Sequence, residues 1–199
     1  IWACLDALGV VRPVIVGHSF GGTVALAMGQ RRPGAARGLV LMAPASSPRI
    51  PSLGLVAFAP VMRVSDAWAA ALSMMASDTM IQAFLMRIFT PDPVPDGYVA
   101  HFGPRLALVQ EKQAHRIRQI AVLRDSLRRL SVGVPALATP SLVLHGTHDR
   151  VLRFAHHGAA LAAALPRGHL HALPGTGHMP HHVRTAEVVQ AIAGFALSL

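Results

Sequence analysis

The sequence has a single cysteine, Cys4, and few charged residues for its length of 199. One cysteine cannot form an internal disulfide, and this thiol gives no catalytic signal. Only 14% of the residues are charged whereas 52% are hydrophobic, which excludes an intrinsically disordered chain. A chain of this size and apolar content can bury one substantial core.

Apolar runs long enough to span a membrane are also missing. The longest segment without Asp, Glu, Lys or Arg lies between Arg129 and Asp149. Glycine and proline interrupt it at Gly133, Pro135, Pro140 and Gly146. These residues break a spanning helix, so the sequence predicts no stable membrane insertion.

Lysine is nearly absent, since Lys112 is the only one, and acidic residues are scarce. The 18 Lys+Arg against 9 Asp+Glu give a formal net charge of +9. In the densest basic segment, residues 116–129, apolar residues follow one helical stripe and the charges occupy the remaining circumference. We interpret this segment as a solvated helix face and expect no nucleic-acid partner.

What the chain does contain is a short serine motif, Gly-His-Ser-Phe-Gly at residues 17–21. An apolar run typical of a strand, residues 13–16, precedes it, and a helical pattern, residues 23–30, follows. A serine hydroxyl becomes a nucleophile only when a base takes its proton, so it must stand clear of the backbone. A sharp turn between strand and helix exposes Ser19 in this way.

Small residues are required around such a turn because strand and helix approach closely. Gly17 and Gly21, two residues on either side of Ser19, meet that requirement. Gly22 leaves the start of the helix open, so the amide N–H of Phe20 can point at a developing oxyanion.

An acidic partner for the serine is expected after a later strand. Residues 141–146 read as a buried strand, and the polar loop that follows contains Asp149. In open α/β sheets, binding and chemistry collect at the carboxyl ends of the strands. The other strand that could carry the acid, residues 38–42, is followed by no carboxylate until Asp66.

A histidine must follow the acid, and the chain has twelve. His178 is the one that lies on a glycine-flanked loop directly after a predicted strand, residues 168–173. His171 lies within that strand, whereas His181 and His182 follow Pro180. We interpret those three as structural or surface residues.

With the serine turn and the two loops in place, the chain resembles the α/β-hydrolase superfamily. The resemblance implies an α/β fold with a mostly parallel sheet flanked by helices. It also implies that Ser19 is the nucleophile, His178 the general base and Asp149 the residue that orients it, with the Phe20 amide as one oxyanion donor. No cofactor is expected.

Nearly a hundred residues separate the strands at 38–42 and 141–146, far more than one crossover helix requires. Helical pieces such as residues 65–89 alternate there with prolines. The sequence therefore predicts a hydrolase core at residues 1–44 and 136–199 and a helical cap at 45–135, as resemblance to capped family members also implies.

The beginning of the chain departs from the family pattern. Superfamily members have several strands before the serine turn, one of which is followed by a second oxyanion donor, but here only residues 1–11 precede the strand. We therefore expect an N-terminally truncated piece of a longer protein, weak or inactive on its own. We expect a cytoplasmic location and leave a signal peptide open.

An apolar cap over such a site favours small, uncharged, hydrophobic substrates. The first expectation is a carboxylesterase that works through an acyl-enzyme. Hydrolysis of C–C bonds, acyl transfer, perhydrolysis and binding of a ligand without turnover remain as alternatives.

The many histidines also raise the question of a metal site. The groupings at residues 145–149, His156-His157 and His181-His182 lack the established spacing of metal ligands. Adjacent imidazoles are moreover expected to point apart on most backbones. The sequence predicts no metal.

Overall fold

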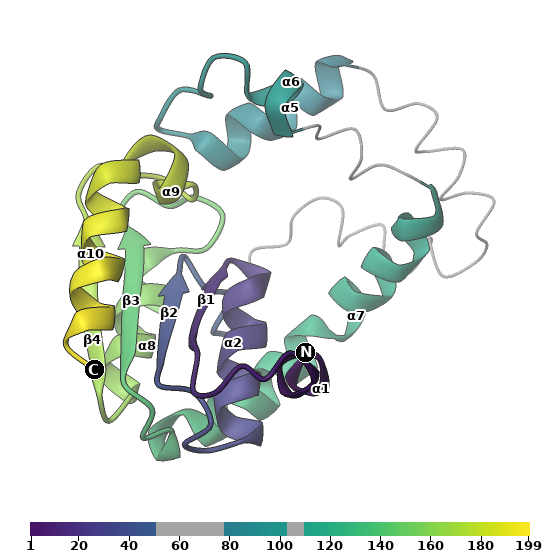
Figure 1. Ribbon diagram of the computed structural model, residues 1–199. Coiled ribbons are helices and arrows are strands. Elements are labelled where there is room, and N and C mark those ends of the chain that lie inside the picture. Colours follow the sequence, from purple (N-terminus) through teal and green to yellow (C-terminus); the bar gives the residue numbers. More distant parts are fainter. Residues whose placement is uncertain (51–77, 103–109) are drawn as a thin grey trace.

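A computed structural model describes residues 1–50, 78–102 and 110–199 of the chain (Figure 1). Its centre is a four-stranded sheet in which every neighbouring pair is parallel and the strand order follows the sequence. The strands are β1 (Val14–His18), β2 (Gly38–Met42), β3 (Ser141–Gly146) and β4 (Gly168–Leu173). All four strands were predicted from apolar runs and turn signals.

Register brings the carboxyl ends of the strands to one edge. His18 pairs with Met42, which pairs with Leu144, which pairs with His171. The segments that follow β1, β3 and β4 therefore leave the sheet on the same side. Residues 19, 149 and 178 belong to those segments.

Helices cover both faces of the sheet. The element bounds are α1 (Trp2–Ala7), α2 (Phe20–Arg31), α5 (Asp78–Phe89), α6 (Tyr98–Phe102), α7 (Gln110–Gly133), the 3₁₀ turn η3 (Val134–Ala136), the π-helical turn η4 (Ala155–Ala159), α8 (Ala160–Ala164), α9 (Pro180–Val183) and α10 (Thr185–Leu197). The helix predicted over residues 154–165 thus begins with a π-helical turn before it continues as α8. The predicted α/β architecture, a mostly parallel sheet flanked by helices, is confirmed.

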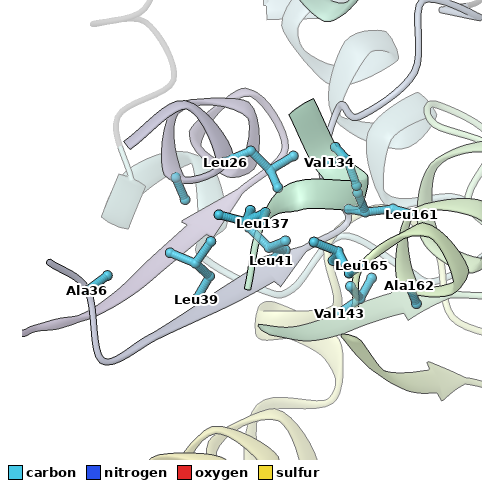
Figure 2. Packing of buried hydrophobic residues seen from close by; sticks show 11 residues of the cluster. Leu26, Ala36, Leu39, Leu41, Val134, Leu137, Val143, Leu161, Ala162 and Leu165 are labelled. Carbon is cyan, nitrogen blue, oxygen red and sulfur yellow. The ribbon is translucent and has the colours of Figure 1, made fainter. Parts of the chain in front are cut away.

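One face packs against α2 and α8. Leu26 of α2 and Leu161 of α8 meet Leu39 and Leu41 of β2 and Val143 of β3, as Figure 2 shows. All five side chains are buried, and each such burial contributes on the order of 1.5–3 kcal/mol to folding. This core fixes α2, and hence the serine at its N-terminus, on the sheet.

The opposite face packs against α10. Val188 and Phe195 of α10 contact a buried cluster formed by Val40, Leu142 and Leu144. Because β2 and β3 are covered on both faces, they read as continuous apolar runs instead of alternating ones.

The two outer strands are less protected. Val16 of β1 is 48% exposed and Leu170 of β4 is 42% exposed. No strand in the described part of the chain pairs with the outer edge of β1. Within the described residues, β1 is therefore an edge strand.

Helices α5, α6 and α7 lie between β2 and β3 in the sequence. In Figure 1, α5 and α6 lie beyond the arrowheads of the strands, near α9. Leu85 and Phe89 of α5 form a small core with Met179, next to His178. Most of the predicted helical piece at residues 65–89 lies outside the described residues, and the limits of the predicted cap remain a prediction.

The basic segment in α7 is described in part. Leu127 is fully buried against Ala45 and Leu152, whereas Arg124, Arg128 and Asp125 are exposed. This agrees with a solvated helix face over the residues whose side chains are described. Among the helices of residues 1–50, 78–102 and 110–199, none has both the length and the apolar character needed to cross a membrane.

Candidate active site

Ser19 lies at the junction between β1 and α2, as the N-cap of the helix. Its backbone has φ 53° and ψ −117°, a conformation that residues other than glycine rarely adopt. Its N–H donates to the Met42 carbonyl at 2.9 Å, and its own carbonyl accepts from Gly22 and Ala45. These hydrogen bonds hold a strained turn that costs on the order of 1–3 kcal/mol.

The glycines around the turn differ in their roles. A Cβ at Gly17 would overlap the Gly21 carbonyl, which confirms the need for glycine at residue 17. A Cβ at Gly21 would meet no atom of the described chain within 4 Å, so the expectation for Gly21 is wrong. At this turn the Gly21 carbonyl, and not the Gly21 α-carbon, is the group that lies close to Gly17. The next glycine is constrained, because a Cβ at Gly22 would lie 2.6 Å from the Pro44 Cβ.

The predicted oxyanion donor is the backbone amide of Phe20, which is the first residue of α2. An N–H in the first turn of a helix has no intrahelical acceptor. The partial positive charge of the helix N-terminus also favours a negative atom at this position. The Phe20 N–H thus belongs to the helix end next to Ser19, where donors lack helical partners.

The structure brings the three predicted side chains together. The Ser19 Oγ lies 3.0 Å from His178 Nε2, and His178 Nδ1 lies 2.7 Å from Asp149 Oδ2. Because the carboxylate accepts, Nδ1 carries the proton, and Nε2 then presents a lone pair to the Ser19 hydroxyl. Residues 159 positions apart in the sequence thus form one hydrogen-bonded chain.

Asp149 is a buried carboxylate with four donors around it. The Val151 and Leu152 amides each donate to Oδ1 at 2.8 Å, and the imidazoles of His178 and His145 contact Oδ2. Burial by itself raises the pKa of Asp149, but the hydrogen bonds from His145 and His178 outweigh it. They hold the pKa of this carboxyl well below its usual range.

Two of the contacts around these residues were not predicted from the sequence. His145 is fully buried, with Nε2 3.1 Å from Asp149 Oδ2. His18 Nε2–H donates to the His178 carbonyl at 2.9 Å. This hydrogen bond fixes the backbone of His178. Burial and the neighbouring His178 lower the pKa of His18 to about 4. The signal for His145 was present, because it is the one ionisable residue in the buried strand β3.

His181 and His182 also lie near this site. The His18 and His181 ring centroids are 4.4 Å apart, and those of His181 and His182 are 4.2 Å apart. The expectation that adjacent imidazoles point apart is therefore wrong for this pair. The two rings lie close together while each packs on another aromatic neighbour. His181 packs on His18, and His182 packs edge-on against Tyr98 and Phe102. Burial, with the nearby His18, lowers the pKa of His181 to about 3.

The segment after α5 contacts the His178 loop directly. The Asp92 carboxylate accepts from the Gly177 N–H at 2.7 Å. A Cβ at Gly177 would lie 2.5 Å from the Thr90 carbonyl oxygen. Only glycine permits this approach, which places residues 89–92 against the backbone beside His178.

Together, the fold and the site define a class of protein. It is an α/β protein with a serine, a histidine and an acid on three separate loops at the carboxyl edge of a parallel sheet. The chain belongs to the alpha/beta hydrolase family, whose sequence model matches residues 3–191.

Relatives and solved structures agree with this membership. The 2-hydroxymuconate semialdehyde hydrolase of Pseudomonas putida is 32% identical over 194 residues, which cover 94% of this chain and 64% of the relative. The protein of the same name from Pseudomonas sp. (strain CF600) is 29% identical over 195 residues, 93% of this chain and 63% of the relative. The chain thus spans about two thirds of the length of these curated relatives.

Similar folds occur in solved structures. An alpha/beta hydrolase fold protein from Burkholderia ambifaria matches with a TM-score of 0.73 at 21% identity, over 96% of this chain and 68% of that one. A meta-cleavage product hydrolase from Pseudomonas fluorescens IP01 matches with a TM-score of 0.64 at 19% identity, over 98% and 68%. At this identity the likeness shows the fold alone.

Proposed function

We propose that the chain is a serine hydrolase in which Ser19 is the nucleophile, His178 the general base and Asp149 the residue that orients it. The observation that carries the proposal is the hydrogen-bonded chain from the Ser19 hydroxyl through both nitrogens of His178 to the Asp149 carboxylate. A hydrogen-bonded nucleophile and base, with the base held by a third group, is the arrangement that activates a serine.

The first half of the reaction forms an acyl-enzyme. His178 Nε2 takes the Ser19 proton while Oγ attacks a substrate carbonyl, and the electron pair of the C=O bond moves onto oxygen. The Phe20 N–H stabilises that oxyanion. When the carbonyl reforms, the bond to the leaving group breaks, and the proton on Nε2 passes to the leaving group. The Asp149 carboxylate stabilises the imidazolium that exists between the two proton transfers.

The second half repeats these steps with water. Water gives a proton to Nε2 and attacks the acyl carbonyl, and the bond to Ser19 Oγ then breaks. The proton returns to Oγ, which restores the hydroxyl and releases a carboxylic acid. No cofactor enters either half.

For the substrate, we place ring-cleavage products of the 2-hydroxymuconate semialdehyde type first. The support is the name shared by the two curated relatives. In such a compound the bond that breaks is C–C, and the leaving group is an enolate that takes the proton from His178. The sequence alone pointed first to carboxylesters. Esters remain the second candidate because the imidazoles and aromatic rings near the site suit uncharged groups.

The experiment is active-site labelling with a fluorophosphonate. We expect stoichiometric attachment at Ser19, abolished in Ser19→Ala and His178→Ala, and unchanged in His169→Ala, which alters an exposed histidine on β4. Attachment elsewhere, or none to a folded chain, would contradict the proposal and favour a binding protein that performs no turnover. Rates with nitrophenyl esters and with 2-hydroxymuconate semialdehyde then decide between the two substrate classes.

A further inference from the structure

A second imidazole contacts the acid of the site. His145 lies at the end of β3, four residues before Asp149, and its side chain is fully buried. Its Nε2 is 3.1 Å from Asp149 Oδ2, the oxygen that also faces His178 at 2.7 Å. The same Nε2 is 2.9 Å from the Leu152 carbonyl.

These contacts fix the tautomer of His145. Both atoms that face Nε2 are acceptors, so Nε2 must carry a proton and share it between them. Nδ1 is buried and has no hydrogen-bond partner in the described part of the chain. A proton on Nδ1 would therefore be buried without an acceptor, which is costly. His145 thus directs its Nε2–H at the carboxylate.

Packing holds this ring in place. A Cβ at Gly158 would lie 2.8 Å from the His145 ring, so the π-helical turn η4 closes over it. Phe154 contacts the ring edge-on, with centroids 5.8 Å apart. These neighbours restrict the ring to the orientation in which its N–H faces Asp149.

We propose that His145 is a positioning residue for the reaction, a role that rests on the proposed function. Its N–H holds Oδ2 while backbone amides hold Oδ1, so the carboxylate keeps its orientation when His178 changes protonation. It also takes part of the negative charge of Oδ2. Less charge then remains on Oδ2 to hold a proton on His178, which favours transfer of that proton to the leaving group.

The groups that face the His178–Asp149 pair come from several elements. Besides His145 on β3, they are Ser19 and His18 at the end of β1, His181 on α9 and His157 in η4. His18 and His181 carry a proton only well below neutral pH. Near neutral pH these two imidazoles are therefore uncharged and add no positive charge beside the pair.

The test compares two side chains of similar length. The amide of His145→Gln can place an N–H near the position of the imidazole Nε2, whereas His145→Met offers no donor. With the fluorophosphonate, we expect the labelling rate of Ser19 to fall roughly tenfold in His145→Met, since a hydrogen bond to a charged group contributes about one factor of ten. The acid limb of its pH profile moves to higher pH. His145→Gln recovers most of the rate and the original profile.

Thermal unfolding of both variants separates this role from simple core packing. If His145 only fills space, the two variants lose stability and rate together and the acid limb stays where it is. That result overturns the inference while Ser19 labelling in the unaltered chain still supports the proposed function. Absence of labelling in the unaltered chain would instead contradict the proposed function.

A measurement on the unaltered chain covers the case in which His145→Met does not fold. Nitrogen-15 shifts of the imidazoles should give the Nε2–H tautomer for His145. Its N–H proton should shift upfield as pH is lowered across the acid limb, because the protonated His178 competes for Oδ2. An Nδ1–H tautomer, or an N–H resonance whose shift stays constant as pH is lowered, overturns the inference.

Discussion

The Asp92 carboxylate accepts the Gly177 N–H at 2.7 Å and so ties the segment after α5 to the loop that carries His178. The two residues are 85 positions apart in the sequence. Prolines at residues 91, 93 and 95 flank Asp92 and end the helix before it. The proline-rich stretch between α5 and α6 therefore supports the site, in addition to interrupting helices.

Removing this contact should loosen the His178 loop. We expect Asp92→Leu to lower the fluorophosphonate labelling rate of Ser19 by about tenfold, because a hydrogen bond to a charged group is lost. Asp92→Asn keeps an acceptor oxygen and should retain most of the rate. Equal losses in the two variants would show that the charge, and not the hydrogen bond, holds the loop.

Substitution of the glycines at the serine turn should have opposite effects. Gly17→Ala places a methyl group on the Gly21 carbonyl, so we expect a loss of several kcal/mol in the free energy of unfolding, and loss of labelling. Gly21→Ala adds a methyl group in open space within α2 and should stabilise the chain by about 0.5–1 kcal/mol. Chemical denaturation measures both, and a destabilised Gly21→Ala chain would contradict the described turn.

Asp149→Asn should affect both stability and reactivity. All four groups around the carboxylate donate hydrogen bonds. In Asp149→Asn an NH₂ group replaces one oxygen, so a donor faces donors and hydrogen bonds are lost. We expect a loss of about 1–3 kcal/mol in unfolding free energy and a fall in labelling rate on the order of 10⁴-fold. The pKa of Asp149 is held low in the folded chain. The stability that it contributes is therefore present above the unfolded pKa and is lost as pH falls through the folded pKa.

Asp149→Asn should therefore show a weaker loss of stability with acid than the unaltered chain. Unfolding midpoints between pH 5 and pH 3 check this, with Asp125→Asn as the control because that carboxylate is exposed on α7. Parallel acid profiles for the unaltered chain and Asp149→Asn would contradict the hydrogen-bond pattern described.

His157 should make stability depend on pH at a higher range. Its Nδ1 accepts the Ser46 N–H at 3.2 Å and its Nε2–H donates to the Arg49 carbonyl. Burial lowers the pKa of His157 to about 4 from 6.5. Between these values the unfolded chain binds a proton that the folded chain does not, so stability falls as pH is lowered, by up to about 3 kcal/mol.

His157→Asn keeps an acceptor for the Ser46 amide but cannot take up the proton. We expect a shallower loss of stability between pH 6.5 and pH 4 than in the unaltered chain. His169→Asn, at an exposed position, should leave the slope unchanged. His18 and His181, whose pKa values burial also lowers, contribute to the slope that remains. An unchanged slope in His157→Asn would show that its ring does not titrate as described.

The sheet and the three loop residues could be predicted because their signals are local. Buried parallel strands read as continuous apolar runs, and a glycine-flanked serine or histidine directly after such a run marks a strand-ending loop. Ser19 and His178 carry such a signal, and Asp149 lies in the polar loop that follows a buried strand. The order of the strands then brings their loops to one edge, although their roles in catalysis remain proposals.

The surroundings of these residues could not be predicted because they depend on contacts between distant segments. No local pattern states that Asp92 reaches Gly177 or that His181 packs on His18. Whether residue 21 tolerates a side chain depends on which backbone atom of the turn approaches Gly17, and here that atom is the Gly21 carbonyl oxygen. His145 could have been suspected, since an ionisable side chain in a buried strand requires a partner.

The exposed flank of β1 has a consequence for handling the chain. An open row of backbone amides and carbonyls is a template on which a strand from another molecule can add, and half-exposed Val16 offers it an apolar contact. Concentrated preparations should therefore form intermolecular β-structure, visible as growing light scattering and dye binding. A charged side chain introduced at residue 16 should delay that aggregation without touching the catalytic edge.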